Sequence, residues 1–260
     1  MNATAVATPA PACAAHRAGV ELSVVVPFYN PGPALRPTIE RLITCLTQTG
    51  ITFEIIAVSD GSTDGSATTL TGLTAVTVLD NPTNQGKGAA LHQGFATATG
   101  AWIGFIDADG DIDPQHLADY LTIARTGGHA VVYADKRHTH SVSGATRTRK
   151  LISLTYSTLV STLFGLDIRD TQTGCKIIRR DVLQQILPRL RERRFAFDLE
   201  LFVAATTAGI TDLKAAPVRL ETRTAGSTVS TTSIIRTLRD TLTIHRRRRA
   251  HHYAAYALAA

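Results

Sequence analysis

Cysteine is scarce in this chain of 260 residues. The three cysteines, Cys13, Cys45 and Cys175, lie far apart and form no C-x-x-C pair. A sparse and odd count provides no disulfide framework, and it indicates reduced thiols in a cytosolic setting.

The sequence also lacks a run long and apolar enough to cross a membrane. Residues 151–166 read LISLTYSTLVSTLFGL without a charge, but a spanning helix needs about 20 residues. We expect a helix here that is either buried in the core or faces a membrane. Residues 1–20 have neither the basic nor the strongly apolar region of a signal peptide, and their bias toward Ala, Pro and Thr predicts a disordered leader.

An acidic excess is absent as well, because the net charge is +6 and much of the positive charge lies near the end of the chain. Arg236, Arg239 and the run Arg246–Arg249 predict an anionic partner: phospholipid, a phosphorylated substrate or nucleic acid. No aromatic residues alternate with these charges, and no helix-turn-helix or zinc spacing accompanies them. We therefore expect no nucleic-acid partner.

Residues 231–260 are expected to form a basic amphipathic segment. Its apolar residues recur at helical spacing, at Ile234, Ile235, Leu238, Leu242 and Ile244. Such a helix either lies on an anionic membrane surface, with the four consecutive arginines contributing to the attraction, or packs on the domain with a solvated basic face.

Short apolar runs alternate with stretches of helical periodicity between residues 21 and 230. Strands are expected at residues 22–27, 53–58, 75–79, 102–106 and 130–133. This alternation predicts an α/β fold with a mostly parallel sheet flanked by helices. The hydrophobic fraction of 44% supports a sizeable core in a single domain over residues 21–230.

Three aspartates follow one of these strands in the segment IGFIDADGDIDP, at Asp107, Asp109 and Asp111. Carboxylates at the end of an apolar strand need a partner, and open α/β sheets bind ligands beyond the carboxyl ends of their strands. Mg²⁺ or Mn²⁺ bridging a nucleotide diphosphate suits this position. A calcium loop is excluded, because its sixth and twelfth positions hold Ile112 and Ala118 instead of Gly and Glu. A plain acidic turn explains only the acid that caps the following helix.

Two glycine-rich turns carry further polar candidates. Asp60 lies in SDGSTDGS and Lys87 in NQGKG. The glycines suit a plain turn with or without a ligand. Lys87 is placed to contact phosphate or base, or it is a solvated lysine, and the P-loop pattern G-x-x-x-x-G-K-[ST] is absent.

The order of these motifs resembles a known family. VVVPFYN, VSDGSTDGS, NQGKGAALHQGF and FIDADGDIDP together resemble the inverting GT-A glycosyltransferases of family two. RDTQTGCKIIRRDVL and RFAFDLELF look like the polyprenyl-phosphate sugar transferases, and the dolichyl-phosphate β-glucosyltransferase branch more than the mannosyl branch. The resemblance covers residues 21–230 and implies the Rossmann-like GT-A fold.

The resemblance implies a site for a nucleotide-sugar donor. Pro27 and Tyr29 would shape the nucleobase pocket, Asp60 would accept hydrogen bonds from the base, and Lys87 would meet phosphate or base. Further implied donor contacts are Asp107 on the nucleotide, Gln172 in the sugar pocket, and Arg223 and Ser227 in a loop over the diphosphate.

The resemblance also implies a metal, Mg²⁺ or Mn²⁺, held by Asp109. Asp111 would be a further ligand, or it would contact the ligands without binding the metal itself. The implied catalytic set is Asp107, Asp109, Arg137 and Asp198.

The acceptor implied by the resemblance is a polyprenyl phosphate held by Arg137, Arg149 and Lys150. A phosphate monoester is largely ionised at pH 7, its second pKa being about 6, so it needs no general base. Four positions depart from the family pattern: Pro31 and Ser59 on the donor side, and Cys175 and Ala216 on the acceptor side.

These features predict a metal-dependent transferase that moves glucose from UDP-glucose to a polyprenyl or dolichyl phosphate with inversion. We expect it in the cytoplasm, bound peripherally to the inner face of an anionic membrane. One alternative is another hexosyl transferase, such as a mannosyl transferase using GDP-mannose, or a transferase to a soluble hydroxyl with Asp198 or Glu200 as base. The other is a non-catalytic module that binds nucleotide-sugar or membrane, with the acids as a structural metal site.

Overall fold

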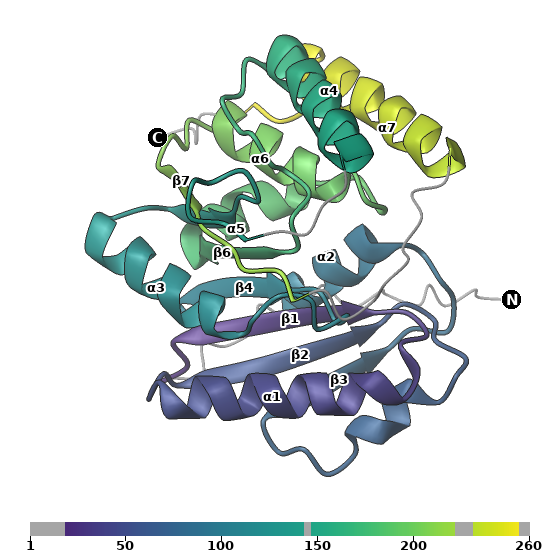
Figure 1. Cartoon of the computed structure of the whole chain (residues 1–260), viewed down its shortest axis with the longest axis vertical. Coiled ribbons are helices and arrows are strands. Elements are labelled where there is room, and N and C mark those ends of the chain that lie inside the picture. The colour runs from purple at the N-terminus through teal and green to yellow at the C-terminus, as the bar shows by residue number, and fades with distance from the viewer. Residues whose placement is uncertain (1–18, 143–146, 222–230, 255–260) are drawn as a thin grey trace, which may run out of the picture.

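The computed structural model describes residues 19–142, 147–221 and 231–254, and only the backbone of residues 147–152 and 231–234. Its centre is a seven-stranded sheet in the order β3-β2-β1-β4-β6-β5-β7 (Figure 1). The strands are β1 (Leu22–Phe28), β2 (Phe53–Ser59), β3 (Val76–Asp80), β4 (Trp102–Ile106), β5 (Val131–Ala134), β6 (Cys175–Arg179) and β7 (Leu213–Ala216).

Helices connect and cover these strands. The α-helices are α1 (Leu35–Gln48), α2 (Lys87–Thr97), α3 (Gln115–Gly127), α4 (Arg147–Phe164), α5 (Arg180–Ile186), α6 (Phe197–Thr207) and α7 (Thr231–Arg249). Short 3-10 turns lie at Gly32–Ala34, Ser66–Leu70 and Leu187–Arg189. Each predicted strand therefore corresponds to one of β1 to β5, with shifts of at most one residue at the ends.

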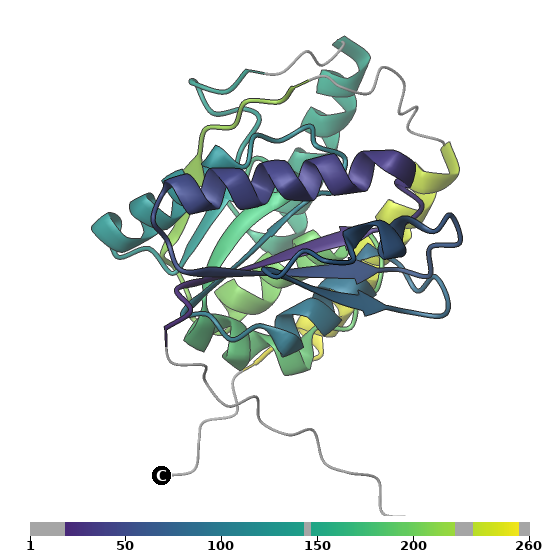
Figure 2. The same ribbon diagram turned by 90° about the horizontal axis from the view of Figure 1, so that it is seen from below.

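Strands β1 to β4 form the parallel half of the sheet. Every residue of β1 is buried, since β1 pairs in parallel with both β2 and β4 and helices cover both of its faces. Helices α1 and α3 bury one face of the sheet, and α2, α5 and α6 bury the other. Figure 2 shows the purple helix α1 on one side of the sheet and the green helices α5 and α6 on the other. The predicted α/β architecture is confirmed.

Strand β6 is the exception to the parallel order, and no run of the sequence predicted it. It lies between β4 and β5 and is antiparallel to both. Because it enters the sheet from the edge where β4 ends, Cys175 pairs with Ile106, and the residues just before β6 lie beside Asp107.

Helices α4 and α7 lie side by side beyond α6 (Figure 1). In α4, Val160 and Phe164 are buried while Leu154 is exposed, so the helix is amphipathic and neither wholly buried nor wholly exposed. In α7, Thr241 and Ile244 are buried against the domain. Within the described part of the chain, no helix is both long and apolar enough to cross a membrane.

The arginine run at the end of α7 corrects one expectation. Arg247 forms ion pairs with Glu192 at 2.6 Å and Glu200 at 3.3 Å. Arg248 donates to the carbonyl oxygen of Phe164 at 2.5 Å. The interpretation of four equivalent membrane-facing cations is therefore wrong: two of them hold α7 on the domain, and Arg246 and Arg249 are the exposed pair.

Candidate active site

The predicted donor residues gather at one edge of the sheet. Tyr29, Asp60 and Asp107 directly follow β1, β2 and β4, which are parallel neighbours, so their carboxyl ends meet. The side chain of Tyr29 is 53% exposed, which leaves its ring free to contact a ligand, whereas Pro27 is buried within β1.

The turns after β1 and β2 are tied together by side chains that the sequence analysis did not assign. Asn30 adopts a left-handed conformation with φ of 47°, and its Oδ1 accepts the N–H of Thr63 at 2.8 Å. Asp64 accepts the N–H of Gly32 at 2.7 Å and the hydroxyl of Ser66 at 2.6 Å. These bonds fix the backbone that follows Tyr29.

Asp60 is buried and anchors the start of α2. Its Oδ1 accepts the N–H of Gln85 at 2.7 Å, and its Oδ2 accepts the N–H of Gly86 at 2.8 Å. The next residue, Gly61, has φ of +74°, and a Cβ there would lie 2.4 Å from the carbonyl carbon of Thr83. Each carboxylate oxygen keeps a second lone pair, so the role of Asp60 toward a nucleobase stays a prediction.

A chain of alternating charges runs from Asp107 into the core. The Nζ atom of Lys87 lies 2.6 Å from Oδ1 of Asp107 and 3.6 Å from Oδ2 of Asp198. On the far side of Asp198, Oδ1 accepts from Nζ of Lys176 at 2.6 Å. Both lysines lie over the ring of Phe105, 5.4 and 4.9 Å from its centre. Burial alone would lower the pKa of Lys87, but the charges of Asp107 and Asp198 outweigh it and raise that pKa.

Lys176 is fully buried and was missed by the sequence analysis. It also donates to the carbonyl oxygen of Thr173 at 2.8 Å. A signal existed, because a lysine within an apolar strand and an aspartate within an apolar helix both need partners. The predicted catalytic residue Asp198 is thus held between two lysines.

The acidic loop after β4 suits a divalent cation shared with a phosphate ligand. Asp109 is exposed, and its Oδ1 accepts the N–H of Asp111 at 3.1 Å. Desolvation by the surrounding protein raises the pKa of Asp109, and the negative charges of Asp107 and Asp111 raise it further. In the described ranges, no three His, Cys, Asp or Glu side chains converge as a complete metal site. Mg²⁺ typically takes only one or two carboxylates and completes its shell with water and substrate phosphate, so these donors fit.

The loop before β6 fixes the other side of Asp107. The N–H of Asp107 donates to the carbonyl oxygen of Gly174 at 3.0 Å, and a Cβ on Gly174 would lie 1.8 Å from Oδ2 of Asp107. The loop is organised by buried Asp170, which accepts the hydroxyl of Thr173 at 2.5 Å. Burial would raise the pKa of Asp170, but nearby Lys136 and these hydrogen bonds lower it overall.

Gln172 lies in the same loop, where the resemblance implied the sugar pocket. Its Nε2 atom is buried and has no hydrogen-bond partner among the described residues. A buried amide donor without a partner costs free energy, so a sugar hydroxyl or phosphate oxygen would satisfy this atom.

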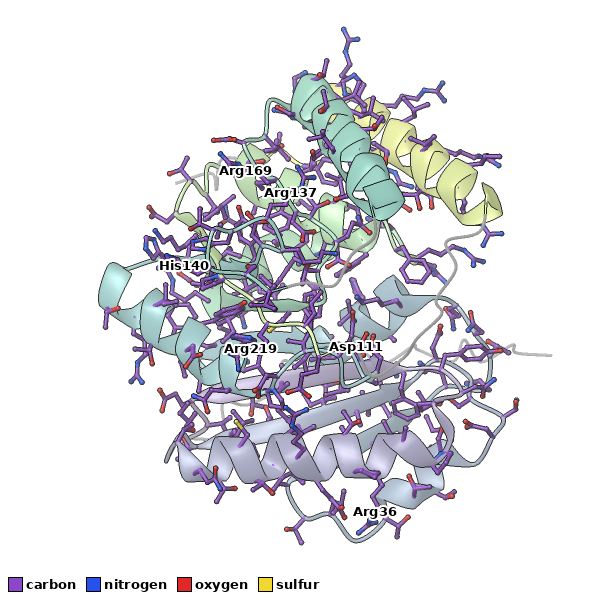
Figure 3. The ribbon with its side chains drawn as sticks, viewed as in Figure 1. Arg36, Asp111, Arg137, His140, Arg169 and Arg219 are labelled. Carbon is purple, nitrogen blue, oxygen red and sulfur yellow. The ribbon has the colours of Figure 1, made fainter. Side chains whose placement is uncertain are left out.

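The predicted acceptor residues lie around the start of α4. The guanidinium of Arg137 donates to the carbonyl oxygen of Ser153 at 2.7 Å, which joins the end of β5 to α4 (Figure 3). Arg149 and Lys150 belong to the first turn of α4, where the structure describes only the backbone. Arg223 and Ser227 also lie outside the described residues.

Glu200, the alternative general base, is engaged elsewhere. It is fully buried, and its Oε2 accepts the N–H groups of Arg191 and Glu192, both at 2.7 Å. Its Oε1 accepts the hydroxyl of Tyr253 at 2.6 Å. The structure therefore contradicts Glu200 as a base, because this carboxylate anchors the C-terminal segment.

Arg41 on α1 contacts Asp113 in the acidic loop and Glu221, which is bonded to that loop. It forms two hydrogen bonds to Glu221, at 2.9 and 2.7 Å, and lies 3.5 Å from Asp113. The N–H of Glu221 donates to the carbonyl oxygen of Asp111 at 2.7 Å. A half-exposed arginine on a helix gives no sequence signal for this contact.

Comparisons with known proteins show the family of the chain. Residues 23–187 match the family described as glycosyl transferase family 2. The chain is 31% identical to the dolichyl-phosphate beta-glucosyltransferase of Drosophila melanogaster, over 72% of this chain and 63% of the relative. It is 30% identical to that of Homo sapiens, over 71% of this chain and 63% of the relative. The chain thus spans less than two thirds of the length of these curated relatives.

Solved structures share the fold. The crystal structure of mannosyl-3-phosphoglycerate synthase from Rubrobacter xylanophilus aligns with a TM-score of 0.70 at 17% identity, covering 93% of this chain and 77% of that one. Glucosyl-3-phosphoglycerate synthase from Mycobacterium tuberculosis, crystallised with Mn²⁺, UDP-glucose and phosphoglyceric acid, aligns with a TM-score of 0.66 at 18% identity, covering 94% and 83%. The predicted GT-A fold is confirmed.

Proposed function

Because the chain belongs to glycosyl transferase family 2, we propose that it transfers glucose from UDP-glucose to a polyprenyl phosphate with inversion at the anomeric carbon. The observation that carries the proposal is the state of the two α6 carboxylates. Asp198 is paired with Lys176 and Lys87, and Glu200 is buried under Tyr253. Neither is placed to take a proton from a hydroxyl, which favours an acceptor that attacks as an anion.

The donor half of the reaction uses the edge formed by β1, β2 and β4. Tyr29 and Asp60 would hold the base, and Gln172 the sugar. Lys87 and the N-terminus of α2 would hold the diphosphate, since a helix start attracts anions. We also assign Arg223 and Ser227 to the diphosphate, on the resemblance alone. The relatives named dolichyl-phosphate beta-glucosyltransferase support glucose as the transferred sugar and a dolichyl phosphate as the acceptor.

Asp107 and Asp109, with Asp111 beside them, would hold Mg²⁺ or Mn²⁺, which supplies positive charge to the leaving diphosphate. An oxygen of the acceptor phosphate forms the new bond to the anomeric carbon. The bond from that carbon to UDP breaks, and its electron pair leaves with the diphosphate. No proton moves, because the attacking oxygen is already ionised at pH 7. Arg137, Arg149 and Lys150 would hold the acceptor phosphate in line.

A lipid acceptor requires contact with a membrane, and α4 and α7 offer a suitable surface. Leu154, Ile235 and Leu242 are 54%, 67% and 48% exposed. Exposed arginines on α7 accompany them: Arg236, Arg239, Arg246 and Arg249. Apolar side chains beside cations suit an anionic bilayer. We propose peripheral binding to the inner, cytoplasmic face.

The proposal is tested by measuring UDP release from UDP-glucose with and without a short polyprenyl phosphate. We expect release that depends on the acceptor and a product with the β-configuration. GDP-mannose as donor and 3-phosphoglycerate as acceptor are the comparison substrates. Preferred use of GDP-mannose would replace the donor assignment, and transfer to the hydroxyl of 3-phosphoglycerate at an equal rate would overturn the acceptor assignment.

A further inference from the structure

Lys87 is paired with Asp107, one of the carboxylates proposed to hold the metal. Its Nζ lies 2.6 Å from Oδ1 of Asp107, a full ion-pair contact. The other oxygen, Oδ2, packs against Gly174 so closely that a Cβ there would lie 1.8 Å away. Lys87 thus neutralises Oδ1, while Oδ2 faces Gly174, so a second cation at Asp107 would lie close to the ammonium group of Lys87.

The ammonium group has a second partner within reach. Oδ2 of Asp198 lies 3.6 Å from Nζ of Lys87, while Oδ1 of Asp198 is held at 2.6 Å by Lys176. Lys176 and Asp198 are both buried, so the Asp198 carboxylate is fixed beside Lys87. Bringing Nζ from 3.6 Å to the 2.6 Å of a full ion pair would join Lys87 to Asp198 in place of Asp107.

The charges in this chain balance without a ligand, with Lys176 and Lys87 opposite Asp198 and Asp107. A divalent cation added alone would meet Lys87 as a like charge at close range. A nucleoside diphosphate brings negative charge with it, and its oxygens offer Lys87 a new partner.

We propose that Lys87 is a resident cation that blocks Asp107 until a nucleoside diphosphate draws it away, so that metal and nucleotide bind together. In the free protein Lys87 neutralises Asp107. When the diphosphate arrives, Lys87 turns to it and to Asp198, and an oxygen of Asp107 becomes available. This inference rests on the proposed function, and it adds an order of binding to it.

The test measures binding of free Mn²⁺ by electron paramagnetic resonance on the whole chain, without nucleotide. We expect Lys87→Met to bind Mn²⁺ at least tenfold more tightly than wild type, although it removes a group proposed to bind the donor. Lys214→Met is the matched control, because Lys214 is exposed on β7 and its loss changes the net charge equally. It should bind Mn²⁺ as wild type does. Adding Asp109→Asn to Lys87→Met should remove the gain, which locates the ion at the acidic loop.

Nucleotide coupling gives a second readout. In wild type, UDP should lower the Mn²⁺ dissociation constant more than tenfold, and in Lys87→Met this coupling should fall by at least tenfold. Lys87→Gln removes the charge but keeps a hydrogen-bond donor, so it serves if the methionine variant does not fold. Equal free-Mn²⁺ affinity in wild type and either folded variant overturns the proposal, as does a wild type whose UDP and Mn²⁺ bind independently. Failure of the proposed function is a separate result, a wild type that binds no UDP at all.

Discussion

Gly174 sets the position of the Asp107 carboxylate, because its missing side chain leaves the space in which Oδ2 of Asp107 lies. We expect Gly174→Ala to lower kcat about 100-fold, since displacing a reacting group by about 1 Å has an effect of that size. Gly127→Ala is the control, because a Cβ there meets only the ring of His129. Steady-state kinetics and a thermal melt would check this. Wild-type kcat in Gly174→Ala would show that the position of Asp107 does not limit turnover.

Asp170 makes a pH-dependent contribution to stability. Its pKa is lowered in the folded protein, so its stabilisation is fully present above the unfolded-state value of about 3.9 and is lost as the pH falls through the folded-state pKa. We expect Asp170→Asn to reduce the free energy of unfolding by about 3 kcal/mol at pH 7, the scale for disrupting a buried charged network. The difference from wild type should shrink below about pH 4 in urea titrations. A difference that stays constant with pH would mean that shape, and not charge, explains the loss.

At the scale of elements, α1 reaches the acidic loop through Arg41. We expect Arg41→Gln to weaken Mn²⁺–UDP binding several-fold while changing the free energy of unfolding by less than about 1 kcal/mol, because a partly exposed ion pair contributes little to stability. Arg36→Gln is the matched control, since Arg36 pairs with Glu40 on the same helix (Figure 3). Isothermal titration calorimetry would measure the affinities. If Arg41→Lys restored none of the lost affinity, a positioning role based on charge would be excluded.

At the scale of the whole molecule, one face of α7 packs on the domain, and the opposite face is proposed to contact an anionic membrane. We expect the double substitution Arg246→Gln and Arg249→Gln to reduce co-sedimentation with anionic liposomes at low salt, each arginine contributing about 1 kcal/mol near the bilayer. The melting temperature should not change. Arg247→Gln should lower the melting temperature instead, because it leaves buried Glu200 and half-buried Glu192 without their cation. Equal sedimentation of the double variant and wild type would remove the membrane role of this face.

Much of the fold was predictable because its signals are local. The apolar runs at β1, β2 and β4 fixed both the parallel half of the sheet and the edge where Asp60 and Asp107 meet. Strand β6 was not predictable, since Lys176 interrupts its apolar run and pairing direction is a long-range property.

The candidate site divides in the same way. Asp107 and Asp109 were found because they directly follow a strand. The pair Lys176 and Asp198 was missed, because its members come from β6 and α6 and each looks like a polar interruption within an apolar element. The contacts of Arg247 were missed for the opposite reason: a run of arginines resembles a solvated surface, and only packing distinguishes its members.

The antiparallel strand β6 also sets the order in which the molecule can assemble. All four strands of the parallel half end by Ile106, whereas Cys175, the residue of β6 that pairs with Ile106, comes about 70 residues later in the chain. During synthesis, the parallel half can therefore form while α4 and β6 are still to be made. Gly174 can lie beside Asp107 only after β6 has joined the sheet. A chain arrested before that step would have a compact parallel half but an incomplete active site.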